Sequence, residues 1–227
     1  MLPLISCLVP TIPNRETFWP TMFRSFNNDI WPNKEIILIG EGESKSPIPE
    51  NVKYIETPLG TSIGKKLNIG VKFSSANYFQ KRDDDDWYSP NFLSTTIKPL
   101  LSCPKLVSIA GRHITFLVKE WELYEMPLPT LGGGTICFDR KSWEQKKFKD
   151  LSFGEDQDFI NNREKISLIT PNPLNYVLIR HGNNTWKTWS NGKTVEEVAK
   201  TTGTLIPGGP ESFFSKDDLN FYQSLRS

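Results

Sequence analysis

Short apolar segments alternate with helix-like segments through the first half of the chain. The apolar runs 4–9, 35–39 and 52–56 have the length and composition of buried strands. The segments 17–27 and 62–74 repeat apolar residues at the spacing of a helix face. This alternation is typical of βαβ units, which build a parallel sheet covered by helices on both faces. The sequence therefore predicts an α/β fold.

Turn-forming and acidic residues follow these predicted strands directly. Pro10-Thr11 follows the first strand, and Gly40-Glu41-Gly42-Glu43 follows the second. Four aspartates, Asp83–Asp86, follow a further short strand at 78–81. In parallel sheets, ligands bind outside the carboxyl ends of the strands. We therefore expect these segments to border one ligand-binding crevice.

The run Asp83–Asp86 needs an explanation, because two carboxylates about 4 Å apart repel by roughly 1 kcal/mol in water. An isolated acidic run is most simply a solvated turn. Here an apolar strand precedes the run and Trp87-Tyr88-Ser89-Pro90 follows it, which favours the edge of a sheet. Mn²⁺ and Mg²⁺ bind carboxylate and phosphate oxygens and would suit such a place. If the run is extended, Asp83 and Asp85 point to one side, and Asp84 and Asp86 to the other.

The second half combines short strands and helices in a less regular order. The predicted strands are 106–110, 113–119 and 176–179. The predicted helices are 141–147, 159–165, 194–201 and 216–225. We expect a main domain at 1–190, with halves at 1–90 and 91–190, and a helical appendage at 191–227 packed on it.

Two further groups of residues have both a structural and a chemical interpretation. Glu155 and Asp156, within Gly154-Glu155-Asp156-Gln157-Asp158, either cap a helix or supply a general base. Such a base takes the proton of an acceptor hydroxyl and contributes roughly 10²–10⁴-fold to a rate. His181 follows the predicted strand 176–179 and is either structural or a metal ligand beside an aspartate.

Glycine, lysine and tryptophan residues give weaker indications. Gly133, in a glycine triplet at 132–134, forms a tight turn or lets the backbone approach a ligand. Lys66 lies on a solvated helix face or offsets the charge of a diphosphate. Trp186 packs in the core or stacks on a sugar ring or base.

Composition excludes few classes of protein. The 227 residues suit one large domain, and a net charge of +1 gives no global attraction to nucleic acid or membranes. Three cysteines without CxxC spacing favour neither a zinc site nor a disulfide framework. No apolar run reaches the 18 or so residues of a membrane span, and the N-terminal segment lacks the features of a signal peptide. We expect a cytoplasmic protein.

In their order along residues 4–189, these segments resemble the GT-A glycosyltransferases, specifically the large inverting family 2 of bacterial polysaccharide and cell-surface sugar transferases. The resemblance rests on the following segments: Ile5–Thr11, Glu35–Ile39, Ser62–Gly70, Asp83–Pro90, the glycine triplet, Gly154–Asp156 and His181. It implies a Rossmann-like nucleotide-binding half, an acceptor half with a small antiparallel sheet, and a short helical tail.

The resemblance also implies roles for individual residues. Asp83 and Asp85 match the DxD motif, so that Asp85 would bind Mn²⁺ or Mg²⁺ and Asp83 would share the ion or contact the ribose. His181 matches a histidine that joins the metal in some members, and Asp156 matches the catalytic base. The expected donor-site residues are Pro10, Thr11, Glu41, Lys66, Asp83 and Asp84. The expected acceptor or sugar pocket consists of Gly133, Glu155 and Trp186.

The resemblance implies two partners, a nucleoside diphosphate sugar and an acceptor hydroxyl. A UDP-sugar is expected, as is usual in the family. The nucleotide base stays open, because family members commonly carry aspartates after the second strand, where this chain has Glu41. The acceptor is open among a glycan, a lipid-linked sugar, a protein side chain and, less expected, nucleic acid. A nucleotidyltransferase would need a glycine-rich basic loop, which 11–15 is not. An inactive binding module would have lost the base or the metal ligands, which are present.

Overall fold

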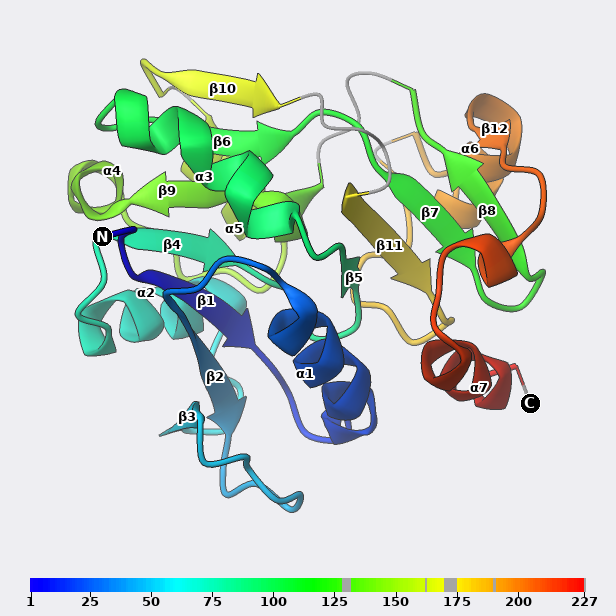
Figure 1. The fold of residues 1–227 in the computed structure, drawn as a ribbon, viewed down its shortest axis with the longest axis horizontal. Helices are drawn as coiled ribbons and strands as arrows, with labels where there is room; N and C mark the ends of the chain where they lie inside the picture. Colours follow the sequence, from blue (N-terminus) through cyan, green and yellow to red (C-terminus); the bar gives the residue numbers. More distant parts are fainter. Residues whose placement is uncertain (128–131, 162, 170–174, 190, 227) are drawn as a thin grey trace.

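The computed structural model describes residues 1–127, 132–161, 163–169, 175–189 and 191–226. Its larger sheet has seven strands in the order β10-β6-β9-β4-β1-β2-β3 (Figure 1). The strands are β1 (Ile5–Pro10), β2 (Lys34–Glu41), β3 (Val52–Thr57), β4 (Tyr78–Lys81), β6 (Val107–Ala110), β9 (Cys137–Asp139) and β10 (Ile166–Ile169). Strands β1 to β4 are parallel to one another, and β9 runs antiparallel between β4 and β6. The α/β fold predicted from the alternation is confirmed.

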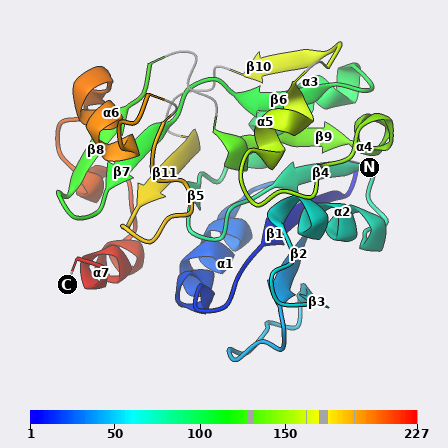
Figure 2. The ribbon, with the colours of Figure 1, turned by 180° about the vertical axis from the view of Figure 1, so that it is seen from behind.

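Helices cover both faces of this sheet because alternate residues of its strands point to opposite sides. Ile5, Cys7 and Val9 face a cluster with α1 (Trp19–Asn28) and α3 (Phe92–Ser102). Leu8 faces a second cluster on the opposite face of the sheet, which contains side chains from three further helices. Those helices are α2 (Ile63–Phe73), α4 (Arg140–Gln145) and α5 (Glu155–Ile160), seen from behind in Figure 2.

A second, five-stranded sheet lies beside the first, in the order β12-β8-β7-β11-β5. Its strands are β5 (Trp87–Tyr88), β7 (Ile114–Leu117), β8 (Glu122–Glu125), β11 (Tyr176–Arg180) and β12 (Thr204–Leu205). All its neighbouring strands are antiparallel except β7 and β11. Helix α6 (Val195–Thr202) and helix α7 (Lys216–Ser224) follow, with short 3₁₀ helices η1 (Glu16–Phe18), η2 (Gly133–Thr135) and η4 (Pro210–Ser212) elsewhere.

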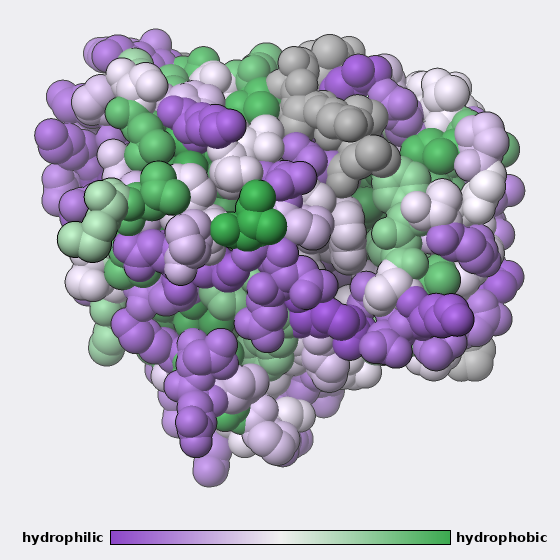
Figure 3. All heavy atoms as spheres, viewed as in Figure 1, coloured by the Kyte–Doolittle hydropathy of each residue, from purple (hydrophilic) through white to green (hydrophobic). Residues whose placement is uncertain are grey.

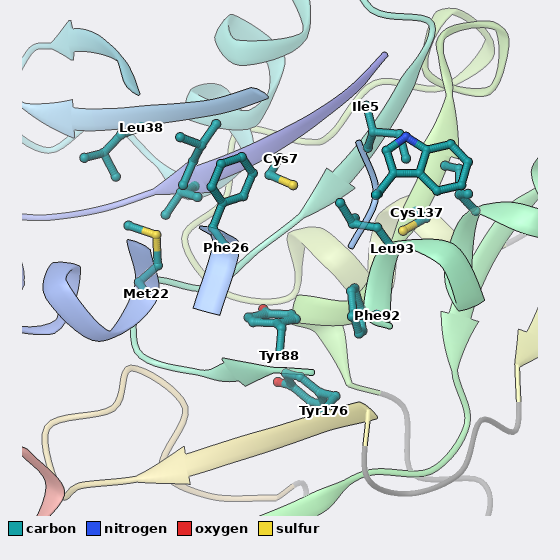
Figure 4. Close-up of a cluster of buried hydrophobic side chains, with 14 of the residues drawn as sticks. Ile5, Cys7, Met22, Phe26, Leu38, Tyr88, Phe92, Leu93, Cys137 and Tyr176 are labelled. Carbon is teal, nitrogen blue, oxygen red and sulfur yellow. The ribbon is translucent and has the colours of Figure 1, made fainter. Parts of the chain in front are cut away.

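The two sheets meet through aromatic side chains. Tyr88 of β5 lies with its ring centroid 5.2 Å from Tyr176 of β11 and 4.9 Å from Phe92 of α3 (Figure 4). All three rings are almost fully buried. Strand β5 comes directly after the aspartate run, so this packing holds Asp83–Asp86 at the junction of the sheets.

Two details differ from the sequence prediction. The helix expected at 159–165 is wrong, because α5 begins at Glu155 and ends at Ile160. Gly154 has a φ of +76°, which allows the chain to turn there. The acidic residues in the first turn of α5 then stabilise the helix by their favourable interaction with its dipole. Helix α3 was not predicted, although Pro99 lies inside it. Leu131, next to the predicted glycine turn, lies outside the described residues.

The surface in the view of Figure 1 is mixed in polarity. Hydrophilic residues predominate in a band across its middle, and apolar residues show mainly above that band (Figure 3). Within the described ranges, no helix is long and apolar enough to span a bilayer.

Candidate active site

A cavity of about 900 Å³ lies at the carboxyl ends of β1 and β4, where they face the second sheet. Ten of the predicted site residues line it: Pro10, Thr11, Lys66, Asp83, Asp84, Asp85, Gly133, Glu155, Asp156 and Trp186. The other two lie behind its wall, where Glu41 contacts Lys66 and His181 contacts Asp85. Pro10-Thr11 and Asp83–Asp86 therefore border one cavity, together with residues from the second half. The expectation that the turn at 40–43 also borders it is wrong, because Glu41 only contacts the lining residue Lys66.

The aspartate run is bent, so the alternation expected for an extended run is wrong. The chain bends at Asp84 and Asp85, and the guanidinium of Arg15 contacts both. Arg15 Nη1 lies 2.9 Å from Asp84 Oδ1 and 2.5 Å from Asp85 Oδ2. Thr11 also donates its hydroxyl to Asp84 Oδ2 at 2.6 Å. A buried cation thus offsets the repulsion between these two carboxylates.

Asp85 also contacts His181. The distance between His181 Nε2 and Asp85 Oδ2 is 3.0 Å, and the His181 ring packs 4.4 Å from the ring of Phe18. Asn184 Nδ2 lies 3.3 Å from the same carboxylate oxygen. The segment after β11 therefore brings two side chains to Asp85 from almost 100 residues further along the chain.

The surroundings of Asp84 and Asp85 shift their pKa values in opposite directions. Burial, followed by the charge of Asp85, raises the pKa of Asp84 to about 7. Burial also acts to raise the pKa of Asp85, but the hydrogen bond to His181 and the charge of Arg15 lower it overall. Asp85 is therefore the carboxylate of the two that stays ionised most readily.

Asp86 has a structural role. Its carboxylate accepts hydrogen bonds from the Tyr176 hydroxyl and, at 3.0 Å, from the backbone N–H of Ile179. Both donors belong to β11, so Asp86 fastens the aspartate run to the second sheet.

Asp83 and Glu155 share the buried lysine Lys81. Lys81 Nζ lies 3.0 Å from Asp83 Oδ1 and 3.6 Å from Glu155 Oε1, with the lysine side chain 5% exposed. Although burial opposes its charge, the carboxylates of Asp83 and Glu155 raise the pKa of Lys81. Burial raises the pKa of Glu155, and the charge of Lys81 counteracts this. Lys81 thus connects Asp83 with the segment that carries Asp156.

Asp156 lies in the first turn of α5 and against the glycine triplet. A Cβ atom added to Gly133 would be 1.8 Å from Asp156 Oδ2, so glycine is required for this close approach. The other carboxylate oxygen of Asp156, Oδ1, accepts a hydrogen bond from the backbone N–H of Gln157 at 2.6 Å. The carboxylate lines the same cavity as Asp85, on the side formed by the second half of the chain.

Lys66 and Glu41 form a buried ion pair. Lys66 Nζ lies 2.6 Å from Glu41 Oε1 and donates to the carbonyl oxygen of Thr11 at 2.7 Å. Glu41 Oε2 accepts the N–H of Gly60 at 3.0 Å. Lys66 is fully buried, so the interpretation that it lies on a solvated helix face is wrong.

Trp186 and Trp189 form an aromatic wall of the cavity. Their ring centroids lie 4.7 Å apart at an angle of 71°, and Trp186 Nε1 donates to the carbonyl of Thr188 at 3.0 Å. Both rings are partly exposed, which leaves aromatic surface for a ligand.

The donor atoms near Asp85 suit a divalent ion in part. In the described part of the chain, no group of three or more His, Cys, Asp and Glu side chains is arranged to hold a metal. The 3.0 Å separation of Asp85 Oδ2 and His181 Nε2 nevertheless suits neighbouring ligands of an octahedral ion, whose bonds are about 2.1 Å long. Such ions commonly take further oxygens from substrate phosphates. The residues thus fit a two-ligand site that a diphosphate would complete.

Comparisons with known proteins bear on the fold. No protein-family model matches the chain. An uncharacterized glycosyltransferase of Haemophilus influenzae is 22% identical over 234 residues, which cover 87% of this chain and 71% of the relative. The crystal structure of S. aureus TarS 1–349 matches with a TM-score of 0.55 at 15% identity, covering 78% of this chain and 60% of that one. A second S. aureus TarS structure gives a TM-score of 0.55 at 14% identity and covers 79% of this chain and 37% of that one.

The chain has a glycosyltransferase fold. It spans 60% and 37% of the two TarS chains, so these comparisons concern the fold that they share.

Sequence reasoning did not identify three residues of this glycosyltransferase-fold site. They are Arg15, Lys81 and Asn184, each of which contacts an aspartate of the run. Arg15 was considered only as part of a poor phosphate loop. Four adjacent carboxylates require nearby cations, and this requirement is the signal that could have directed attention to Lys81 and Arg15.

Proposed function

We propose that this protein is a metal-dependent inverting glycosyltransferase of the GT-A type. It transfers one sugar from a nucleoside diphosphate sugar, with UDP as the preferred nucleotide, to the hydroxyl of a glycan or another acceptor. The observation that carries this proposal is the placement of Asp85 and Asp156 around one cavity, with His181 in contact with Asp85 from behind the cavity wall. The glycosyltransferase name of the Haemophilus influenzae relative supports the same class of reaction.

The donor side of the cavity would bind the nucleotide and its diphosphate. Asp85 and His181 would hold Mn²⁺ or Mg²⁺, with Asp83 as a further ligand or a ribose contact. When bound, such an ion neutralises the charge that develops on a departing diphosphate. Thr11 directly follows β1, and Lys66, near the start of α2, donates to its carbonyl oxygen. Lys66, paired with Glu41, would hold Thr11 and the end of β1 in place beside the nucleotide.

Asp156 would act as the general base. It takes the proton of the acceptor hydroxyl while the hydroxyl oxygen forms a bond to the anomeric carbon. The bond from that carbon to the diphosphate breaks at the same time, and the diphosphate leaves with the bonding electrons, so the configuration inverts. Gly133 leaves room for this carboxylate, and Trp186 would bind a ring of the acceptor or the sugar.

Thermal unfolding with a panel of nucleoside diphosphates and nucleotide sugars tests the proposal. A ligand at about 100 times its dissociation constant stabilises the folded state by roughly 2.7 kcal/mol, which raises the melting temperature. We expect UDP or a UDP-sugar to raise it with Mn²⁺ present, and Asp85→Asn to abolish the rise. Asp217→Asn, which changes an exposed carboxylate outside the cavity, is the matched control. If no nucleotide or nucleotide sugar raises the melting temperature of the wild type, the proposed donor site is refuted.

A further inference from the structure

Arg15 is held in place over the aspartate run by its local backbone. Asn14 has a φ of +72°, a left-handed conformation that asparagine tolerates better than most residues, and η1 begins directly after Arg15. The Arg15 side chain is 12% exposed. Besides the two carboxylates, it contacts the carbonyl oxygen of Asn183 through Nη2 at 3.2 Å. The turn thus aims a permanent positive charge at Asp84 and Asp85.

The carboxylate oxygen Asp85 Oδ2 is fully engaged in this arrangement. Arg15, His181 and Asn184 all contact this one atom, at 2.5, 3.0 and 3.3 Å. An ion bound to the same oxygen would lie about 2.1 Å from it. The guanidinium could not keep its contact at that oxygen, because space is lacking and two cations would repel there. Arg15 and a divalent ion therefore compete for Asp85.

The other basic residues near the cavity are committed elsewhere. Lys66 contacts Glu41 and Thr11, and Lys81 contacts Asp83 and Glu155. Within the described residues, the ion pairs of Asp84 and Asp85 involve Arg15 but no lysine. Arg15 also lines the cavity, so its guanidinium has space to move into.

We propose that Arg15 exchanges Asp85 for the diphosphate of the donor when the divalent ion binds. Without nucleotide, Arg15 competes with the ion, and the ion binds weakly. With nucleotide, the released guanidinium gains two phosphates as partners, to which its planar fork can donate bidentate hydrogen bonds. Arg15 thus makes the binding of ion and nucleotide cooperative. This inference rests on the proposed metal-dependent donor site.

Calorimetric titration of the full chain with Mn²⁺, alone and with saturating UDP, tests the exchange. Replacing Arg15 by methionine removes the competitor and keeps an unbranched side chain. We expect Arg15→Met to bind Mn²⁺ alone at least 10-fold more tightly than the wild type. We also expect UDP to tighten Mn²⁺ binding in the wild type by a larger factor than in this variant, since the coupling is reciprocal. Arg24→Met, which removes an arginine paired with Asp218 outside the cavity, should behave as the wild type.

Two further variants keep the test decisive if Arg15→Met does not fold. Arg15→Lys retains a positive charge but not the planar fork, and should give intermediate Mn²⁺ affinity and weaker coupling. The double variant Arg15→Met with Asp84→Asn removes one of the carboxylates left unpaired, and should still bind Mn²⁺ alone more tightly than Asp84→Asn. Unchanged or weaker Mn²⁺ binding in these variants, with Mn²⁺ and UDP binding normally to the wild type, would overturn the exchange alone. Failure of the wild type to bind Mn²⁺ even with UDP would overturn the metal-dependent donor site and the exchange together.

Discussion

At the scale of single residues, Asp156 provides the sharpest test of the chemistry. Asp156→Asn keeps the size of the side chain but removes the base, so turnover should fall by about 10²–10⁴-fold. The thermal shift with UDP and Mn²⁺ should persist, because the donor site remains intact. Turnover is measured as UDP released from the donor sugar that stabilises the protein most.

The matched control for this substitution is Asp158→Asn. Asp158 lies in the same first turn of α5, but it pairs with Lys149 at 2.6 Å and does not line the cavity. This variant should retain turnover. Comparable losses in both variants would indicate that the helix terminus, and not a base at Asp156, is what matters.

The cysteines give a second test at this scale. Burial raises the pKa of both Cys7 and Cys137 to about 12, whereas Cys103 is partly exposed. Ellman's reagent at pH 8 should therefore modify one thiol in the native protein and three in guanidinium chloride. A second rapidly reacting thiol in the native protein would contradict the burial of these strands.

The same pKa shifts have a consequence for stability. The folded state keeps these thiols protonated above the ordinary value of 9.0, so their contribution to stability is constant below pH 9. It should decrease as pH rises from 9 towards 12. Serine at both positions should reduce this loss, as measured by urea unfolding between pH 8 and 11.

At the scale of elements, the contact between α2 and the segment before α5 supports the position of Asp156. The Gly64 N–H donates to the carbonyl of Leu151 at 3.0 Å, and a Cβ atom on Gly64 would lie 1.8 Å from the carbonyl oxygen of Lys149. Gly64→Ala should therefore destabilise the fold by about 1–3 kcal/mol, since backbone would have to move. Lys65→Ala, at an exposed position of the same helix, is the control for urea unfolding. Equal stability of the two variants would show that this contact is loose.

Helices and strands could be predicted where their residues show a clear local pattern. Strands β1 to β4 and helix α2 were found from apolar runs and helical spacing, because both faces of this sheet are buried. Strand β5 has two residues and strand β12 also has two, which is too short for any periodicity. Helix α3 was missed although it carries buried Leu93, Ile97 and Leu100 at helical spacing.

At the scale of the whole molecule, residues 204–225 complete the core of the second sheet. Tyr222 of α7 is 1% exposed and packs its ring 5.5 Å from Phe116 of β7 and 5.0 Å from Phe214. The α7 residue Asp218 also forms an ion pair with Arg24 of α1 at 2.6 Å. The expected appendage therefore packs against both the second sheet and the first half of the chain.

Tyr222 allows the packing to be tested. Tyr222→Ala should destabilise the protein by about 3–5 kcal/mol, because it leaves a cavity among aromatic rings. The buried hydroxyl has no hydrogen-bond partner among the described residues, so Tyr222→Phe should be neutral or stabilising. Urea unfolding measures both. A small effect of Tyr222→Ala would show that α7 contributes little to the core.

The sequence by itself determined the α/β class, the strand-end position of the site and the residues Thr11 and Asp83–Asp86 around it. These follow from local patterns, since apolar periodicity reports burial and strand ends report where ligands can approach. The tertiary structure decided how the four aspartates differ from one another. Arg15 pairs with two of them across 69 and 70 positions, and Tyr176 bonds to Asp86 across 90. Which distant side chain neutralises a buried charge depends on how the two sheets pack together, and no local pattern in the sequence encodes that packing.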